Sequence, residues 1–364
     1  MRGVGPLGRL GRRLLGSEYF VLCLSLAYFA VLWAVKPAAA SPANLADLSS
    51  NVWPLLVLVI GQMFVLVAGG IDLSQMSVMA MASVVGSMIM TTKLDPVVFD
   101  RNPLWGTILT ADGGLLSGSA WAIPVAIAAM LLVGALVGLF NGFAVAKLKM
   151  PPFMVTLVTM FFFSGLAIYA TRSENIGNLP RAFTDIGQSA AVYVTVGRAR
   201  IAVVPYSFLL AAPLAAAAHL ILSRTLWGHW LYAVGMNVQA ARVSGVPVER
   251  VQMLAYVLSG LCAAVGSILY SARLGGGRPT LGETMLLDVI AAAVIGGVSL
   301  FGGKGKVTWA LLGVVFLALL TKSLNQMNVS FYMVNIIKGA VILVAASLDV
   351  LRARWAAAVQ MEGR

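Results

Sequence analysis

The chain alternates long apolar runs with short polar connections, and this alternation constrains its fold more than any other feature. Most of the runs approach the roughly 20 residues that a helix needs to cross a bilayer. Only 10% of the 364 residues are charged and 60% are apolar, whereas soluble domains carry about 25% charged residues. Apolar helices satisfy their own backbone hydrogen bonds in lipid. The sequence therefore predicts an all-α integral membrane protein.

We predict ten membrane-spanning helices. The ten runs are residues 19–35, 52–68, 74–91, 121–146, 153–170, 205–222, 251–273, 285–300, 307–320 and 331–348. These runs divide the chain into a basic N-terminal segment (1–18), a transmembrane domain (19–350) and a C-terminal tail (351–364). The first run could instead be a signal peptide cleaved near residues 38–41. We expect a retained helix, because its apolar core exceeds the usual length of roughly 7–15 residues.

Basic residues in the connections set the orientation. With the N-terminus inside, 14 Lys and Arg residues lie inside and 10 lie outside. Six of the outer ten fall in the long loops 92–120 and 171–204, which influence orientation less than short loops do. We therefore expect both termini in the cytoplasm.

Short internal matches suggest a repeat. IDL at 71–73 opens the third run and LDV at 287–289 opens the eighth, while FMV at 153–155 and FYM at 331–333 open the fifth and tenth. Five helices in each half would give the halves opposite topology, as in transporters with inverted repeats. Chance similarity between apolar segments is the competing explanation.

The connection at 224–250 is predicted to contain a short helix outside the bilayer core. Asn237 is a suitable N-cap, Gly245 a suitable C-terminal stop, and Pro247 follows two residues later. About two turns, residues 238–244, remain, which is too short to be stable without a supporting surface. The segment is either an ordinary connection or a helix that docks onto a partner.

Several chemistries are excluded or disfavoured. Cys23 and Cys262 lie in apolar runs, and His219 and His229 are the only histidines, so neither a disulfide framework nor a metal site is expected. The segment GGKGKVT at 302–308 lacks the phosphate-loop spacing. We expect no bound cofactor. The net charge of +12 is scattered between apolar runs, which favours a membrane rather than a nucleic acid partner.

Two charges lie deep in the apolar runs. Asp288 is three residues into the eighth run and Lys338 seven into the tenth, and both runs start from the outer face. Their backbones are expected at depths of about 5 and 10 Å, a difference that a lysine stem can span. We predict an ion pair between these helices. The alternative is that each side chain reaches the outer interface separately.

Five segments, in order, resemble the ribose-type permeases of ABC importers. They are GQMFVLVAGGIDLSQMSVMAMASVV (61–85), NGFAVAKLKMPPFMVTLVTMFFFSGL (141–166), LWGHWLYAVGMNVQAARVSGVPVERVQMLAYVLSG (226–260), LLDVIAAAVIGGVSLFGGKG (286–305) and VNIIKGAVILVAASLD (334–349).

This resemblance implies a permease in the bacterial inner membrane that takes up a monosaccharide or a related polyol. It implies a dimer with a second copy or a paralogue, a periplasmic sugar-binding protein and a separate cytoplasmic ATPase. It also makes the helix at 238–244 the contact with the ATPase. The residues expected to carry that contact are Asn237, Val238, Ala241, Ser244 and Gly245. The loops 92–120 and 171–204 are longer than is usual in the family and would face the binding protein.

Polar side chains inside the runs are candidates for the translocation path, because sugars pair with hydroxyl and amide groups and stack on aromatic rings. The candidates are Asn141, Thr156, Thr159, Tyr256, Asn325 and Asn335. Such residues also hold membrane helices together. The glycine-rich GGIDLS at 69–74 is predicted to be a tight turn, with Asp72 capping the next helix.

Other functions remain as alternatives. An ABC permease could carry amino acids or nucleosides instead. An ion-coupled secondary transporter would need acids within the membrane, and only Asp288 and, marginally, Asp72 qualify. An intramembrane enzyme is the weakest alternative because no catalytic set is visible.

Overall fold

The computed structural model describes residues 20–196 and 199–362, and each of the ten apolar runs forms a helix. These are α2 (Phe20–Val35), α3 (Pro42–Val67), α4 (Gln75–Met90), α6 (Ala122–Ala146), α7 (Pro152–Thr171), α9 (Tyr206–Arg224), α12 (Val248–Leu274), α13 (Leu286–Gly296), α14 (Val307–Gln326) and α15 (Phe331–Glu362). In the described part, α3, α6, α7, α9, α12 and α14 are long and apolar enough to cross a membrane, and the other four offer shorter apolar helices. The protein is a multi-pass, helical membrane protein.

Helices α3 and α12 form the centre of the packing. Most of α3 from Val52 to Val67 is buried, and α12 packs against α3, α4 and α6. A side chain at Gly138 of α6 would lie 2.4 Å from the carbonyl oxygen of Tyr256 in α12, and one at Gly134 would lie 2.3 Å from that of Gly260. Small residues at this spacing let two membrane helices approach closely, so α6 and α12 are held backbone to backbone.

Four helices differ from their predicted bounds for identifiable reasons. Helix α3 begins ten residues before the predicted run, because Ser41 accepts a hydrogen bond from the backbone of Asn44 and Pro42 occupies the first turn. Helix α14 continues to Gln326 and α15 to Glu362, and the polar residues of these extensions fall outside an apolar window. Helix α13 stops at Gly296, because Gly297 adopts a φ of +109°. Its 11 residues span only about 16 Å.

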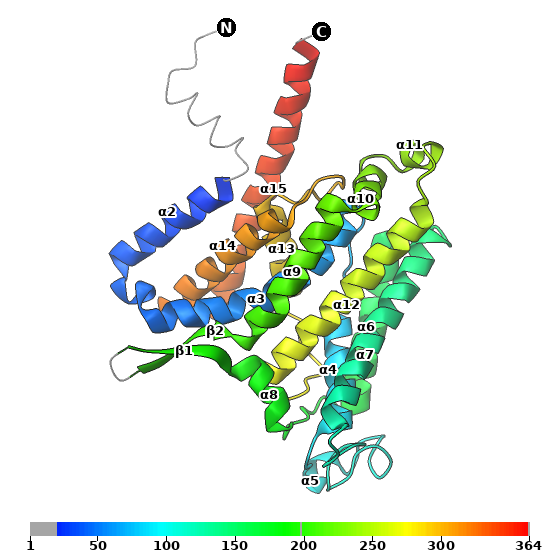
Figure 1. The fold of residues 1–364 in the computed structure, drawn as a ribbon, viewed down its shortest axis with the longest axis vertical. Helices are drawn as coiled ribbons and strands as arrows, with labels where there is room; N and C mark the ends of the chain where they lie inside the picture. Colours follow the sequence, from blue (N-terminus) through cyan, green and yellow to red (C-terminus); the bar gives the residue numbers. More distant parts are fainter. Residues whose placement is uncertain (1–19, 197–198, 363–364) are drawn as a thin grey trace.

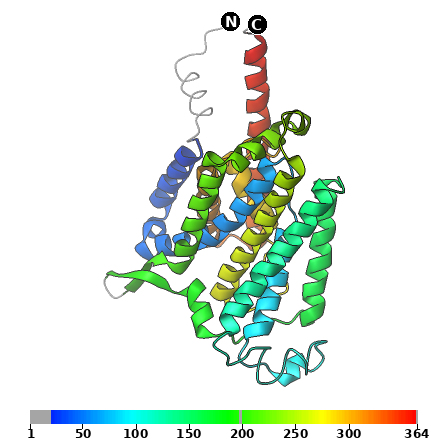
Figure 2. The same ribbon diagram turned by 45° about the vertical axis from the view of Figure 1, so that its right-hand side comes forward.

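The connecting segments lie at two ends of the molecule. Figure 1 places α11 (Val238–Val243) and the end of α15 at one end, and α5 (Pro96–Phe99) and α8 (Arg181–Gln188) toward the other. Figure 2, turned about the vertical axis, keeps the same separation. This arrangement is the one that the alternating topology requires. We call the two the α11 end and, after the orientation that the sequence predicts, the outer end.

The long loop at 171–204 contains structure that the prediction of a plain outer segment missed. Helix α8 is followed by strands β1 (Ala190–Val196) and β2 (Ala199–Pro205), which pair antiparallel. The alternating sequence AVYVTV is typical of a strand. At the other side of the fold, α2 packs on α14, where the hydroxyls of Tyr28 and Ser323 are hydrogen-bonded. The 3₁₀ turn η1 (Pro37–Ala40) links α2 to α3.

Candidate functional site

The connection between α9 and α12 is mostly helical. Helix α10 (Leu226–Met236) follows α9 after Thr225, whose hydroxyl accepts a hydrogen bond from the amide of Gly228. The sequence prediction missed this helix. The predicted short helix is present as α11, because the amide of Ala240 donates to Oδ1 of Asn237 at 3.0 Å. The chain then leaves α11 through Gly245, at a φ of +81°.

Helix α11 presents one side to solvent and one to its own protomer. Val243 is 91% exposed and Val238 is 37% exposed, but Ala241 is only 4% exposed and belongs to the apolar core. The expectation that Ala241 lets a partner approach is therefore wrong, because a short helix needs one face to rest on. Ser244 and Gly245 are exposed. An ion pair of 2.7 Å from Arg242 to Glu249 ties α11 to the first turn of α12.

Gly235 of α10 lies against two other segments, the end of α3 and the glycine-rich loop before α14. A side chain on Gly235 would lie 1.8 Å from the carbonyl oxygen of Val67 and 2.5 Å from the amide of Gly303. The amide of Gly303 donates to that same Val67 oxygen at 2.9 Å. The hydroxyl of Tyr232 donates to the carbonyl oxygen of Gly305 at 2.5 Å. Helix α10 is thus seated on the end of α3 and on the loop before α14. We call this contact the glycine junction.

The glycine-rich turn at 68–74 leads from this junction into a buried chain of polar side chains. Asp72 does not cap α4 as predicted: its Oδ1 accepts from the amide and hydroxyl of Ser74, and its Oδ2 accepts from Ser259 of α12 at 2.6 Å. The hydroxyl of Ser74 accepts from Asn141 of α6 at 2.8 Å, and Asn141 accepts from Thr159 of α7 at 2.7 Å. This polar chain ties α6, α7 and α12 to one turn.

Four of the predicted path residues therefore lie inside the protomer. Asn141, Thr156, Thr159 and Tyr256 are at most 3% exposed, and the hydroxyl of Thr156 donates to the carbonyl oxygen of Ile71 at 3.2 Å. The Tyr256 hydroxyl has no hydrogen-bond partner among the described residues. In this conformation a solute does not reach these four side chains, and their contacts hold helices together.

The remaining predicted residues are near the outer end. Asn325 of α14 and Asn335 of α15 are exposed, as a path would require. Lys338 Nζ lies 2.9 Å from Asp288 Oδ2, and the two side chains are 11% and 21% exposed. The predicted ion pair between α13 and α15 is therefore present. No group of three or more metal-ligating side chains occurs among the described residues.

Comparison with known proteins places the chain in a family. Residues 44–346 match the family described as the permease component of the branched-chain amino acid transport system. The ribose import permease of Haemophilus influenzae is 29% identical, with 94% of this chain and 95% of the relative covered. The xylose transport permease of Escherichia coli is 29% identical with 94% of each covered, and the Bacillus subtilis ribose import permease is 32% identical with 86% and 87% covered. No solved structure matches the chain.

Proposed function

Because the chain belongs to this family of transport permeases, we propose that it is the membrane subunit of an ATP-driven importer for a monosaccharide or a related polyol. The family description names branched-chain amino acids. The sugar is favoured because relatives named for ribose and xylose match nearly the whole chain.

ATP is hydrolysed by a separate cytoplasmic subunit, which docks on α11. One observation carries this assignment: α11 is a capped helix that protrudes at one end of the molecule with Val238 and Val243 exposed and Ala241 seated on the protomer.

The glycine junction supports a route from α11 into the membrane. Force on α11 reaches α10, and α10 bears on Val67 and Gly303 through the close approach of Gly235. The turn that follows Val67 carries Asp72, from which the polar chain reaches α6, α7 and α12. These contacts form a contiguous set of packed groups of the kind that can carry coupling. Closure of the ATPase pair would thus reorient the helices by alternating access.

The remaining partners follow from the same proposal. A second permease subunit, identical or paralogous, completes the path, and a periplasmic sugar-binding protein delivers the solute to the outer end. The protein lies in the bacterial inner membrane with both termini cytoplasmic. The outer segments 92–120 and 171–204, which include α5, α8 and the β1–β2 hairpin, are the surface offered to the binding protein.

The direct test of these partners is affinity capture of the tagged chain from native membranes. An ABC-type ATPase and a soluble sugar-binding protein should be recovered with the wild-type chain. The variant Val243→Asp should retain its membrane abundance and recover less ATPase. Val98→Asp changes an exposed valine of α5, at the opposite end of the molecule, and should recover as much ATPase as the wild type. Capture of neither partner would favour the secondary transporter.

A further inference from the structure

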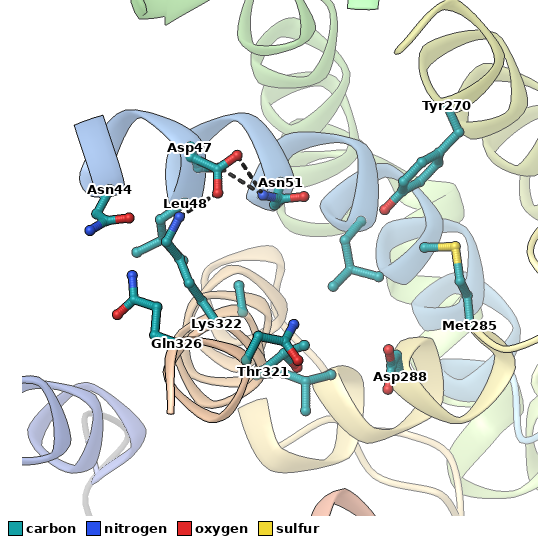
Figure 3. Close-up of a pocket in the computed structure, with 14 residues that line it drawn as sticks. Asn44, Asp47, Leu48, Asn51, Tyr270, Met285, Asp288, Thr321, Lys322 and Gln326 are labelled. Carbon is teal, nitrogen blue, oxygen red and sulfur yellow. Dashed lines mark hydrogen bonds and ion pairs between the residues drawn. The ribbon is translucent and has the colours of Figure 1, made fainter. Parts of the chain in front are cut away.

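An open pocket of about 410 Å³ lies at the outer end of the molecule. Its walls are the first turns of α3 and the last turns of α14, the two polar helix ends that extend past the apolar runs. The end of α12 contributes Tyr270, and the start of α13 contributes Met285 and Asp288. Figure 3 shows these side chains converging on one space. Its volume falls within the range of roughly 300–1,000 Å³ that is usual for small-molecule sites.

The charged groups at this pocket are paired with one another. Asp47 accepts from Lys322 and lies 3.5 Å from Arg273 Nη2. The second carboxylate of the pocket, Asp288, is paired with Lys338 at 2.9 Å. Since each carboxylate already has a cation beside it, a charged ligand would have to compete with an existing ion pair. Three cations, Lys322, Arg273 and Lys338, face the two carboxylates, so the pocket disfavours a cationic ligand.

The neutral polar groups retain hydrogen-bonding capacity. Gln326 lines the pocket, and its Oε1 atom has no hydrogen-bond partner among the described residues. The Oε1 atom is buried in this conformation, so a ligand reaches it only when the side chain turns toward the pocket. Thr321, Asn325 and Asn44 also line the pocket, and the Nδ2 group of Asn44 already donates to the carbonyl oxygen of Ala38 at 2.7 Å. Hydroxyls and amides can each donate and accept. Leu55 and Leu317 supply apolar surface on the same wall. Such a mixture fits a molecule with many hydroxyl groups and an apolar ring face.

We propose that this pocket is a binding site, within the single protomer, for a neutral polyhydroxylated solute such as a monosaccharide. The inference rests on the proposed function and adds the place where the solute first contacts the permease after leaving the binding protein. The site opens at the outer end, where Asp47 and Asn325 are exposed.

The test compares the variants Thr321→Val and Asn325→Ala with Thr321→Ser and with Thr308→Val, a change of an exposed threonine in the first turn of α14 that does not line the pocket. Each is assayed in membrane vesicles with the ATPase and binding protein present. The probes are radiolabelled neutral monosaccharides, including ribose and xylose, and the monodeoxy analogues of any sugar that is taken up. Membrane abundance is measured for every variant.

Loss of one hydrogen bond should lower uptake about three- to tenfold in Thr321→Val and Asn325→Ala, and uptake by Thr321→Ser and Thr308→Val should stay near that of the wild type. In a pocket variant, uptake of at least one deoxy analogue should fall by a smaller factor than uptake of the parent sugar. The reason is that the substitution removes the partner of a hydroxyl that this analogue does not have. The binding protein is the same in every assay, so its own selectivity cancels when the uptake of each sugar by a variant is divided by the uptake of that sugar by the wild type.

Two outcomes would overturn the pocket while leaving the proposed function intact. One is unchanged uptake in both pocket variants. The other is an equal loss for every sugar and analogue, which would reveal a purely structural role. If the wild-type assembly takes up none of the monosaccharides, the proposed function fails and the pocket assignment fails with it.

Discussion

Asp288 and Lys338 illustrate how a single ion pair resolves an unfavourable placement of charge. Each residue lies in an apolar helix, where a lone charge costs up to ~2.5–3.5 kcal/mol at the bilayer centre and less near the surface. Their contact of 2.9 Å offsets much of that cost. Sequence distance along the helices placed the two charges at similar depths, and the packing of α13 against α15 decides for the ion pair over separate contacts with the interface.

The ion pair predicts non-additive effects of substitution. Asp288→Asn and Lys338→Met should each lower stability in detergent by roughly 1–3 kcal/mol, because each leaves one charge without its partner. The double variant should recover part of the loss. Thermal unfolding and membrane abundance are the measurements, since Asp288 also lines the outer pocket and uptake would mix two effects. Strictly additive losses would contradict a stabilising pair.

Gly235 is the residue for which the glycine junction makes the sharpest prediction. A methyl group there would lie 1.8 Å from a backbone oxygen, so Gly235→Ala must push α10 away from Val67. We expect a loss of roughly 1–3 kcal/mol of stability and reduced stimulation of ATP hydrolysis by the loaded binding protein. The matched control is Gly165→Ala in α7, where an added methyl group would have no atom within 4 Å. This variant should have the stability and the ATPase stimulation of the wild type. Equal behaviour of the two variants would refute the close approach.

At the scale of the element, α11 separates a seating face from a docking face. Val243→Asp should leave membrane abundance unchanged and abolish most uptake, because Val243 is 91% exposed and contacts no core residue. Ala241→Asp should instead lower abundance, because it places a charge in the apolar core. Gly245→Asp should also impair uptake, since its φ of +81° disfavours residues with a side chain. Normal uptake by Val243→Asp would exclude α11 as the docking element.

Elements are predictable from this sequence where one local signal dominates. The ten apolar runs and the N-cap Asn237 located ten apolar helices of the described part and α11, because hydrophobicity and capping act within a few residues. Helix α10, the β1–β2 hairpin and the polar ends of α3 and α14 were missed. The residues of these segments are too polar, or alternate too often between polar and apolar, to be recognised as part of a continuous apolar run. The orientation of Ala241 was also missed, since it depends on a surface built by other helices.

At the scale of the whole molecule, the alternating topology predicts where each end of the chain lies. A reporter that is active only in the cytoplasm should work when it is fused after Arg364 and be silent when inserted at Gly114, in the loop of the outer end. The glycine at 114 is held by backbone contacts to Met88 and Thr91, so a flexible linker must flank the insertion. The reverse pattern of activity would contradict the proposed orientation.

Contacts between distant segments could not be predicted from the sequence. The glycine junction joins residues near 67, 235 and 303, and the polar chain joins Asp72 to Asn141, Thr159 and Ser259. Each asparagine or threonine alone fits either a path or a helix contact, and only packing decides between them. The two five-helix halves of opposite topology stay a prediction.

The most direct measurement for an ATP-driven permease is uptake by the captured assembly in proteoliposomes, with the binding protein and radiolabelled ribose or xylose outside and ATP inside. We predict accumulation that requires hydrolysable ATP, persists when ionophores collapse all ion gradients, and is lost in the Val243→Asp variant. Accumulation that follows an ion gradient and ignores ATP would contradict the account.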